Sequence, residues 1–102
     1  KVVVLVDVAT RSAGEFVTMG LQTGDNVTTI GSRTSGADGN ISRFKMVGGY
    51  ETMISGIGIF YPDSTETQRK GVKIDVEVNP TIQGIINDKD EILEKAIEFI
   101  NK

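Results

Sequence analysis

The fold is decided by the opening segment Lys1-Val2-Val3-Val4-Leu5-Val6-Asp7-Val8, an almost continuous run of mostly β-branched residues. Such a run is typical of a strand that is buried on both faces of a parallel sheet. A strand of this type needs neighbours on both sides, and neither an initiator Met nor a leader precedes it. We therefore expect a fragment from the middle of a longer chain. The alternative is a complete small domain with a trimmed terminus.

The segment that follows predicts a helix. Its apolar and small residues recur at the spacing of one helix face, at Ala13, Phe16, Val17, Gly20 and Leu21. Gly24 then ends the helix, because glycine readily adopts the backbone conformation found at helix C-termini. A strand that leads directly into a helix is the expected beginning of an α/β arrangement.

The middle of the chain predicts four more strands. Val27 to Ile30 is a short strand, and Val72 to Val78 alternates apolar and charged residues as a half-buried strand does. Ile41 to Val47 and Tyr50 to Ile59 are joined at Gly48-Gly49, which is a hairpin signal. The polar segment between the hairpin and the last strand is expected to be an exposed loop.

The C-terminal part predicts a final helix. Pro80 ends the last strand, and the isoleucines that follow it are consistent with one short turn of helix. Asp88 or Asp90 caps the final helix. Its apolar face is formed by Ile92, Leu93, Ala96, Ile97 and Ile100. The predicted order is β-α-β-β-β-β-α, which is α/β in character.

The composition excludes several classes of function. The 102 residues suit a single domain and include no Cys and no His. The chain therefore offers no disulfide, no thiol nucleophile, no Cys-ligated zinc and no imidazole base, so that catalysis requiring a histidine must take it from elsewhere. The 11 basic residues are scattered and outnumbered by 14 acidic ones, which argues against nucleic-acid binding. The longest strictly apolar run, Val2 to Val6, is far shorter than the roughly 20 residues that span a bilayer.

Ser12 is the first candidate for chemistry because it lies where the first strand turns into the helix. Unpaired N–H groups and the positive end of the dipole lie at a helix N-terminus, and both can stabilise an oxyanion. The N–H of Ala13 is the natural donor, since the residue after a nucleophile often supplies one. The alternative is a capping box formed by Ser12 and Glu15, which is worth about 1 kcal/mol and involves no catalysis. Spacing alone favours the cap.

The glycine-rich segment from Gly31 to Asn40 is the second candidate. It lacks the Gly-Lys-Ser/Thr ending of a phosphate-binding P-loop, and its glycine spacing differs from that of a dinucleotide fingerprint. Asp38 alone is too few carboxylates for a calcium loop. By itself the segment predicts a turn-rich loop, and the sequence implies no cofactor.

Two groups of carboxylates lie close together in the sequence. Asp88, Asp90 and Glu91 lie where a helix start favours negative charge. Asp75 and Glu77 share one face of a strand and are expected to be solvated. Neither group predicts a metal site.

Taken in order, four pieces of the chain resemble the C-terminal processing (tail-specific) serine proteases, to which the tricorn protease is related. Val3 to Asp7 resembles the apolar strand before the nucleophile, and Ser12-Ala13-Gly14-Glu15 resembles the motif Ser-Ala-Ser-Glu. Ile30 to Gly36 resembles the loop Gly-Glu-x-Thr-x-Gly. Tyr61-Pro62-Asp63 and Gly71 to Val76 resemble the segments Pro-Asp-Gly and Gly-Val-x-Pro-Asp.

The resemblance implies a crotonase-like or ClpP-like α/β spiral, with residues 1–102 as a single unit from the C-terminal portion of a peptidase catalytic domain. It implies that Ser12 is the nucleophile and that Ala13 N–H is an oxyanion donor. It also implies that Gly31, Thr34 and Gly36 shape the loop beside them. The implied substrate is an unstructured peptide or protein C-terminus in the bacterial cell envelope.

The general base departs from the family pattern. Processing proteases use a Ser–Lys dyad, and their lysine position is Ala37 here, which cannot accept a proton. Lys45, on the following strand, would substitute only if the loop folded differently. The tricorn-like branch uses an upstream histidine and a glutamate whose position falls near Gln68, with Glu66 two residues away. Gln68 can orient a histidine but cannot stabilise an imidazolium as an anion does. The chain is therefore closer to a tricorn-like or lysine-lacking branch.

Three interpretations stay open on the sequence. The first is an active serine peptidase whose base lies outside this chain. The second is an inactive relative that binds peptides or apolar ligands, and the third is an unrelated interaction domain in which Ser12 is only a cap. A bare edge on the strand Val2 to Val8 also predicts that the isolated chain forms homo-oligomers or exposes apolar surface.

Overall fold

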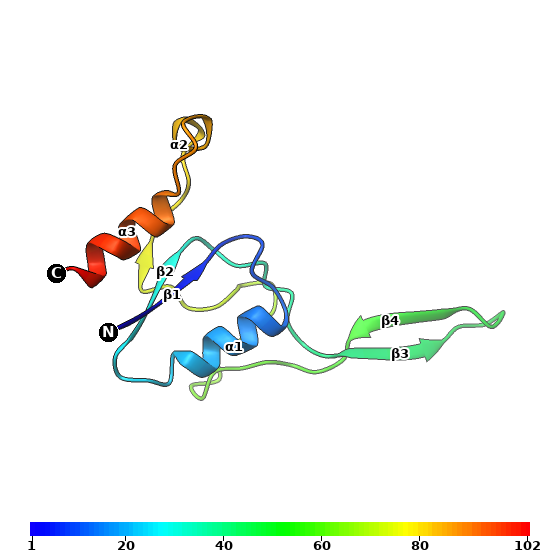
Figure 1. Cartoon of the computed structure of the whole chain (residues 1–102). Coiled ribbons are helices and arrows are strands. Elements are labelled where there is room, and N and C mark those ends of the chain that lie inside the picture. Colours follow the sequence, from blue (N-terminus) through cyan, green and yellow to red (C-terminus); the bar gives the residue numbers. More distant parts are fainter.

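A computed structural model describes all 102 residues. The elements follow in the order β1 (Val2–Val6), α1 (Ala13–Leu21), β2 (Val27–Gly31), β3 (Ile41–Lys45), β4 (Glu51–Ser55), β5 (Val76–Glu77), α2 (Ile82–Ile86) and α3 (Glu91–Ile100) (Figure 1). The predicted mixed α/β class is confirmed. The isoleucine-rich segment after Pro80 forms a separate short helix, α2, whose first turn is capped by Thr81 Oγ1, which accepts from Gly84 N–H at 2.9 Å.

A three-stranded parallel sheet forms the centre, in the strand order β1-β2-β5. β1 pairs with β2 along its whole length, from Val2 opposite Val27 to Val6 opposite Gly31. β2 is thus the only strand with neighbours on both sides. The expectation that β1 is buried on both faces is wrong for this chain, because β1 is an edge strand and Leu5 keeps 42% of its surface exposed.

The last strand is much shorter than predicted, since only Val76 and Glu77 pair with β2. Asp75 still donates its N–H to the Thr29 carbonyl of β2 at 3.0 Å, but Val72 and Lys73 use their backbone groups elsewhere. Val72 N–H donates to Thr34 Oγ1 at 3.0 Å, and the Lys73 carbonyl accepts from Gln22 Nε2 at 2.7 Å. Side chains therefore replace the regular strand ladder over this stretch.

The core lies between the sheet and α3. Ile30, Ile92 and Ala96 are its buried residues, and Val3, Val76, Val78 and Phe99 pack against them. Asp90, one of the two predicted caps, is the one that caps α3, because its Oδ1 accepts from Leu93 N–H at 2.9 Å. Part of the predicted apolar face of α3 stays open, and Ile97 is 53% exposed.

α1 buries a polar face, whereas the sequence predicted an apolar one. Its buried residues are Glu15 and Thr18, whereas Phe16 and Val17 are 60% and 58% exposed. The apolar face seen in the sequence thus faces away from the core of this chain. A polar network takes its place, as described below for Glu15.

The hairpin is confirmed, with its turn at Gly48-Gly49. β3 and β4 pair from Ile41 opposite Ser55 to Lys45 opposite Glu51, and the hairpin extends far from the sheet (Figure 1). All five residues of β3 are exposed. Apolar surface is therefore open on β1, α1 and the hairpin, and oligomerisation through it stays a prediction.

Tyr61 links the long loop to the end of α1 and to the segment before β5. Its hydroxyl donates to Gln22 Oε1 at 2.6 Å and accepts from Lys73 N–H at 2.9 Å. Burial raises the pKa of the Tyr61 phenol above its ordinary value of 10.0, although the Lys73 amide and ammonium oppose the shift. The folded state therefore favours the neutral phenol.

We expect Tyr61 to ionise only above pH 10.0 in the folded protein. The stabilisation that the neutral phenol provides is complete below that pH and is lost as the pH rises through the raised pKa. The variant Tyr50→Phe leaves Tyr61 as the only tyrosine in this chain, which has no Trp, so tyrosinate absorbance reports it directly. A folded-state midpoint at or below 10.0 would contradict the network.

Candidate active site

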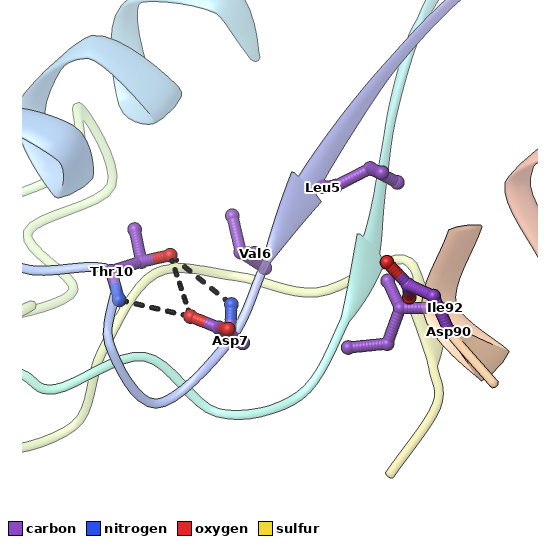
Figure 2. Close-up of a pocket in the computed structure, with 6 residues that line it drawn as sticks. All are labelled: Leu5, Val6, Asp7, Thr10, Asp90 and Ile92. Carbon is purple, nitrogen blue, oxygen red and sulfur yellow. Dashed lines mark hydrogen bonds between the residues drawn. The ribbon is translucent and has the colours of Figure 1, made fainter. Parts of the chain in front are cut away.

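A short turn at the end of β1 carries the chain towards α1. Asp7 Oδ1 accepts from Ala9 N–H at 2.9 Å and from Thr10 N–H at 3.2 Å, while Asp7 N–H donates to Thr10 Oγ1 at 3.1 Å. Figure 2 shows Asp7 and Thr10 turned towards each other in this arrangement. Aspartate favours such turns because its carboxylate replaces a backbone acceptor. The turn places Ser12 immediately before the helix.

The hollow drawn in Figure 2 lies between this turn and the start of α3. Its volume is about 170 Å³, and Leu5, Asp90 and Ile92 line it with the turn residues. Ser12 is absent from its lining, and the Asp7 and Thr10 side chains that reach it are hydrogen-bonded to each other within the turn. We assign no chemistry to it.

Ser12 itself has a strained backbone. Its φ of 51° and ψ of −118° lie outside the regions that residues with a Cβ normally occupy, and its side chain is exposed. Strain of this kind costs of order 1–3 kcal/mol and clusters at functional sites. A sharp, strained strand-to-helix turn is also how nucleophilic serines are presented in other hydrolases.

The capping interpretation of Ser12 holds only in part. Ser12 and Glu15 occupy the positions of a capping box, and Ser12 N–H donates to Glu15 Oε2 at 3.1 Å. The Ser12 side chain faces the Glu15 N–H as in the second arm of the box, without a hydrogen bond of regular geometry. The capping box is therefore present, and it does not exclude a catalytic role for Ser12.

Glu15 joins Ser12 to the glycine loop, and the sequence pattern missed this role. The side chain is fully buried, with 0% exposed. Oε1 accepts from Thr34 Oγ1 and from Gly36 N–H, both at 2.7 Å, and Oε2 accepts from Ala37 N–H at 3.0 Å. Four donors from two distant segments thus surround one carboxylate. The Ser-x-x-Glu spacing signalled a carboxylate near Ser12, but only the fold shows what else it binds.

Ala37 lies directly beside Ser12, because the N–H groups of both residues donate to the same oxygen, Glu15 Oε2. The position that the family resemblance assigns to a lysine therefore adjoins Ser12 in space, but it holds an exposed methyl group. Lys45 does not replace it, since it ends β3 on the hairpin that extends away from the sheet (Figure 1). This chain supplies no lysine at the site.

The loop residues named from the resemblance are all fixed in place. Thr34 is 2% exposed and links Glu15 to Val72 N–H. Gly36 has a φ of 65°, and a Cβ there would lie 2.8 Å from the backbone of Arg69. A Cβ on Gly31 would lie 1.8 Å from the Val6 carbonyl oxygen. Thr34, Gly36 and Ala37 thus meet Ser12 around the Glu15 carboxylate, whereas Gly31 packs against Val6 at the end of β1. Their part in a catalytic site stays a prediction.

The suggested orienting groups lie on the other side of Ala37. Gln68 Nε2 donates to the carbonyls of Asp38 at 2.8 Å and Ile57 at 3.0 Å, so its amide nitrogen holds the loop. Glu66 lies 3.8 Å from the Arg69 guanidinium. Both side chains line a cavity with Ala37, whereas Ser12 does not line it. Orientation of a histidine by either group stays a prediction.

Ala13 is the first residue of α1, so its N–H has no acceptor within the helix. None of the backbone hydrogen bonds outside the regular elements starts from it either. This N–H is free to bind an oxyanion that forms next to Ser12.

The structure contains no group of three or more His, Cys, Asp or Glu side chains that could hold a metal ion. None of its helices is long and apolar enough to cross a membrane.

Three comparisons place the chain among known proteins. No curated protein matches it, but several solved structures share its fold, among them the following two. A candidate peptidase from Parabacteroides merdae ATCC 43184 is 25% identical, with a TM-score of 0.85 over 95% of this chain and 30% of that protein. Mature CPAF in complex with lactacystin is 20% identical, with a TM-score of 0.81 over 96% of this chain and 20% of that protein.

The chain thus spans less than a third of the length of these two proteins. The profile of peptidase family S41 matches residues 1–78, which include Ser12, Glu15 and the complete glycine loop. This match covers most of the sequence, and the residues that carried the resemblance lie within it. The chain belongs to peptidase family S41.

Proposed function

We propose that residues 1–102 form one unit from the C-terminal portion of a serine peptidase catalytic domain, with Ser12 as its nucleophile. The observation that carries the proposal is the backbone of Ser12, which is strained at φ 51° and ψ −118° immediately before α1. Strained backbone of this kind clusters at functional sites, where it presents a reactive group. The crotonase-like or ClpP-like spiral is part of the same proposal.

The proposed reaction follows from the arrangement of these groups. Ser12 Oγ attacks the carbonyl carbon of the scissile peptide bond, and its proton passes to a base that residues outside this chain supply. The free Ala13 N–H donates to the oxyanion of the tetrahedral intermediate. Glu15 takes no proton in this scheme. It acts as a positioning residue that holds Ser12 and the glycine loop at a fixed separation.

The proposed substrates are unstructured peptides or protein C-termini, and the proposed location is the bacterial cell envelope. Both rest on the family resemblance.

A catalytically inactive relative that binds peptides or apolar ligands is the second candidate, and one observation favours it. Ala37 occupies the position beside Ser12 where a Ser–Lys enzyme needs its base.

A fluorophosphonate probe tests the proposal, because it reacts covalently with activated serines. We expect the full natural chain that contains this segment to be labelled at Ser12, with the adduct located by mass spectrometry. Ser12→Ala should abolish labelling. Ser64→Ala is the matched control, since Ser64 is another exposed serine with a positive φ, of 67°, outside the proposed site.

Labelling that persists in Ser12→Ala would place the nucleophile elsewhere. A folded wild-type protein that is never labelled would favour the inactive, peptide-binding relative.

A further inference from the structure

A polar cavity is lined by Ala37 and its neighbours in the glycine loop, and Glu15 is not part of its lining. Its volume is about 310 Å³, and its walls come from the glycine loop, from Ser55 on β4 and from the segment 66–69. Only one of the lining residues is hydrophobic. The volume is at the lower end of the range of ligand sites, roughly 300–1,000 Å³, and suits a single extended side chain.

Asp38 lines this cavity and carries an unpaired carboxylate oxygen. The residue is 5% exposed, and its Oδ1 accepts from Gly39 N–H at 2.8 Å. Its Oδ2 is buried without a hydrogen-bond partner and is the one buried side-chain oxygen or nitrogen in the structure left in that state. The nearby Gln68 amide donates to the Asp38 main-chain carbonyl and so does not satisfy the carboxylate. A buried carboxylate oxygen without a donor is costly, and it calls for a ligand that supplies one.

The charges around the cavity favour a cation. Glu66 adds a second carboxylate to the lining. Arg69 offsets it weakly, because the guanidinium lies 3.8 Å from Glu66 and its side chain is 86% exposed. With two carboxylates and one solvated guanidinium, the lining carries a net negative charge. A metal ion fits poorly, since no third carboxylate or imidazole is close enough to bind it.

We propose that this cavity binds the lysine or arginine side chain of a peptide substrate and that Asp38 determines this specificity. This inference rests on the proposed function, because it takes Ser12 to be the nucleophile that the peptide reaches. Ser12 does not line the cavity itself, but its neighbour Ala37 does. The N–H groups of these two residues share Glu15 Oε2, so the cavity lies near Ser12. The ammonium or guanidinium group pairs with the Asp38 carboxylate, which turns towards the cavity to do so because its Oδ2 is buried in this structure.

Cleavage of matched peptides tests the specificity. In the full natural chain, peptides with lysine or arginine next to the scissile bond should have kcat/KM values about 30-fold above those of norleucine peptides, which keep the alkyl chain and lack the charge. Asp38→Asn should reduce this ratio to near one, because the lysine and arginine peptides lose their charged partner. Glu66→Gln should reduce it less, because Glu66 already has a cationic neighbour. An undiminished ratio in Asp38→Asn, or no preference in the wild type, would overturn the proposal.

Binding without turnover separates this proposal from the one on which it rests. N-acetyl-lysine amide and N-acetyl-norleucine amide are titrated into the Ser12→Ala protein by NMR. Preferential binding of the lysine amide, lost on adding Asp38→Asn, supports the cationic site even if fluorophosphonate labelling fails. Labelling of Ser12 together with equal binding of the two amides would overturn the site and leave the nucleophile standing. Thermal unfolding should show Asp38→Asn to be no less stable than the parent, because asparagine removes an unpaired buried charge.

Discussion

Glu15→Ala is expected to lower the free energy of unfolding by about 3–5 kcal/mol, which is most of the stability of an ordinary domain. The substitution removes the one carboxylate that accepts from Ser12 N–H, Thr34 Oγ1, Gly36 N–H and Ala37 N–H. Each donor left unpaired in a buried position costs about 1–3 kcal/mol. Removal of the fully buried side chain also leaves a cavity. Urea unfolding of the full natural chain measures the loss.

Two companion variants show whether the carboxylate itself is responsible. Glu94→Ala on α3 removes an exposed glutamate and should change stability by no more than about 0.5 kcal/mol. Glu15→Gln retains the side-chain volume but replaces one of the two acceptor oxygens with an NH₂ group. That NH₂ group then points at N–H or O–H donors, which it cannot accept from. With the amide oxygen towards Thr34 and Gly36, the Ser12 and Ala37 N–H groups lose their acceptor.

Glu15→Gln is therefore expected to unfold less readily than Glu15→Ala and to slow fluorophosphonate labelling of Ser12. A loss below about 1 kcal/mol in Glu15→Ala would show that the network is not the main support of the site.

Gly31→Ala is expected to lower the free energy of unfolding by about 4 kcal/mol, through a clash together with backbone strain. Gly31 has a φ of 147°, and an added Cβ would lie 1.8 Å from the Val6 carbonyl oxygen. That oxygen accepts from Ser32 N–H at 3.0 Å, so it cannot move without loss of the β1–β2 pairing. Thermal or urea unfolding, followed by far-ultraviolet circular dichroism, measures the effect.

Gly20→Ala is the matched control for Gly31→Ala. Gly20 lies within α1, and nothing lies within 4 Å of the Cβ that the substitution adds. Alanine is favoured over glycine inside a helix by about 1 kcal/mol, so this variant should be slightly more stable. Equal stability of Gly31→Ala and Gly20→Ala would contradict the packing described for the end of β1.

Local pattern was enough to predict several elements of this protein. The valine run predicted β1, the apolar spacing predicted α1 and α3, and Gly48-Gly49 predicted the hairpin turn. Each of these signals lies within the element that it describes, and hydrophobic periodicity or glycine conformation expresses it directly. Motif order also identified the family, because the segments around Ser12 and the glycine loop keep their order along the chain.

Long-range contacts decided the rest. The Ser-x-x-Glu spacing is the same whether Glu15 only caps a helix or also binds a loop more than 18 residues away, as it does here. The last strand is shorter than predicted because the side chains of Thr34 and Gln22 bind the backbone of Val72 and Lys73. The alternating pattern of residues 72–78 contains no sign of these two distant side chains.

The sequence by itself therefore determined the types of element, their order and the family. Only the tertiary structure decided that a polar face of α1 is buried, that Ala37 adjoins Ser12 and that Asp38 holds an unpaired oxygen. The physical reason is that periodicity records how a segment folds locally. The partner of a buried polar group comes from a distant part of the chain, and only folding brings the two together.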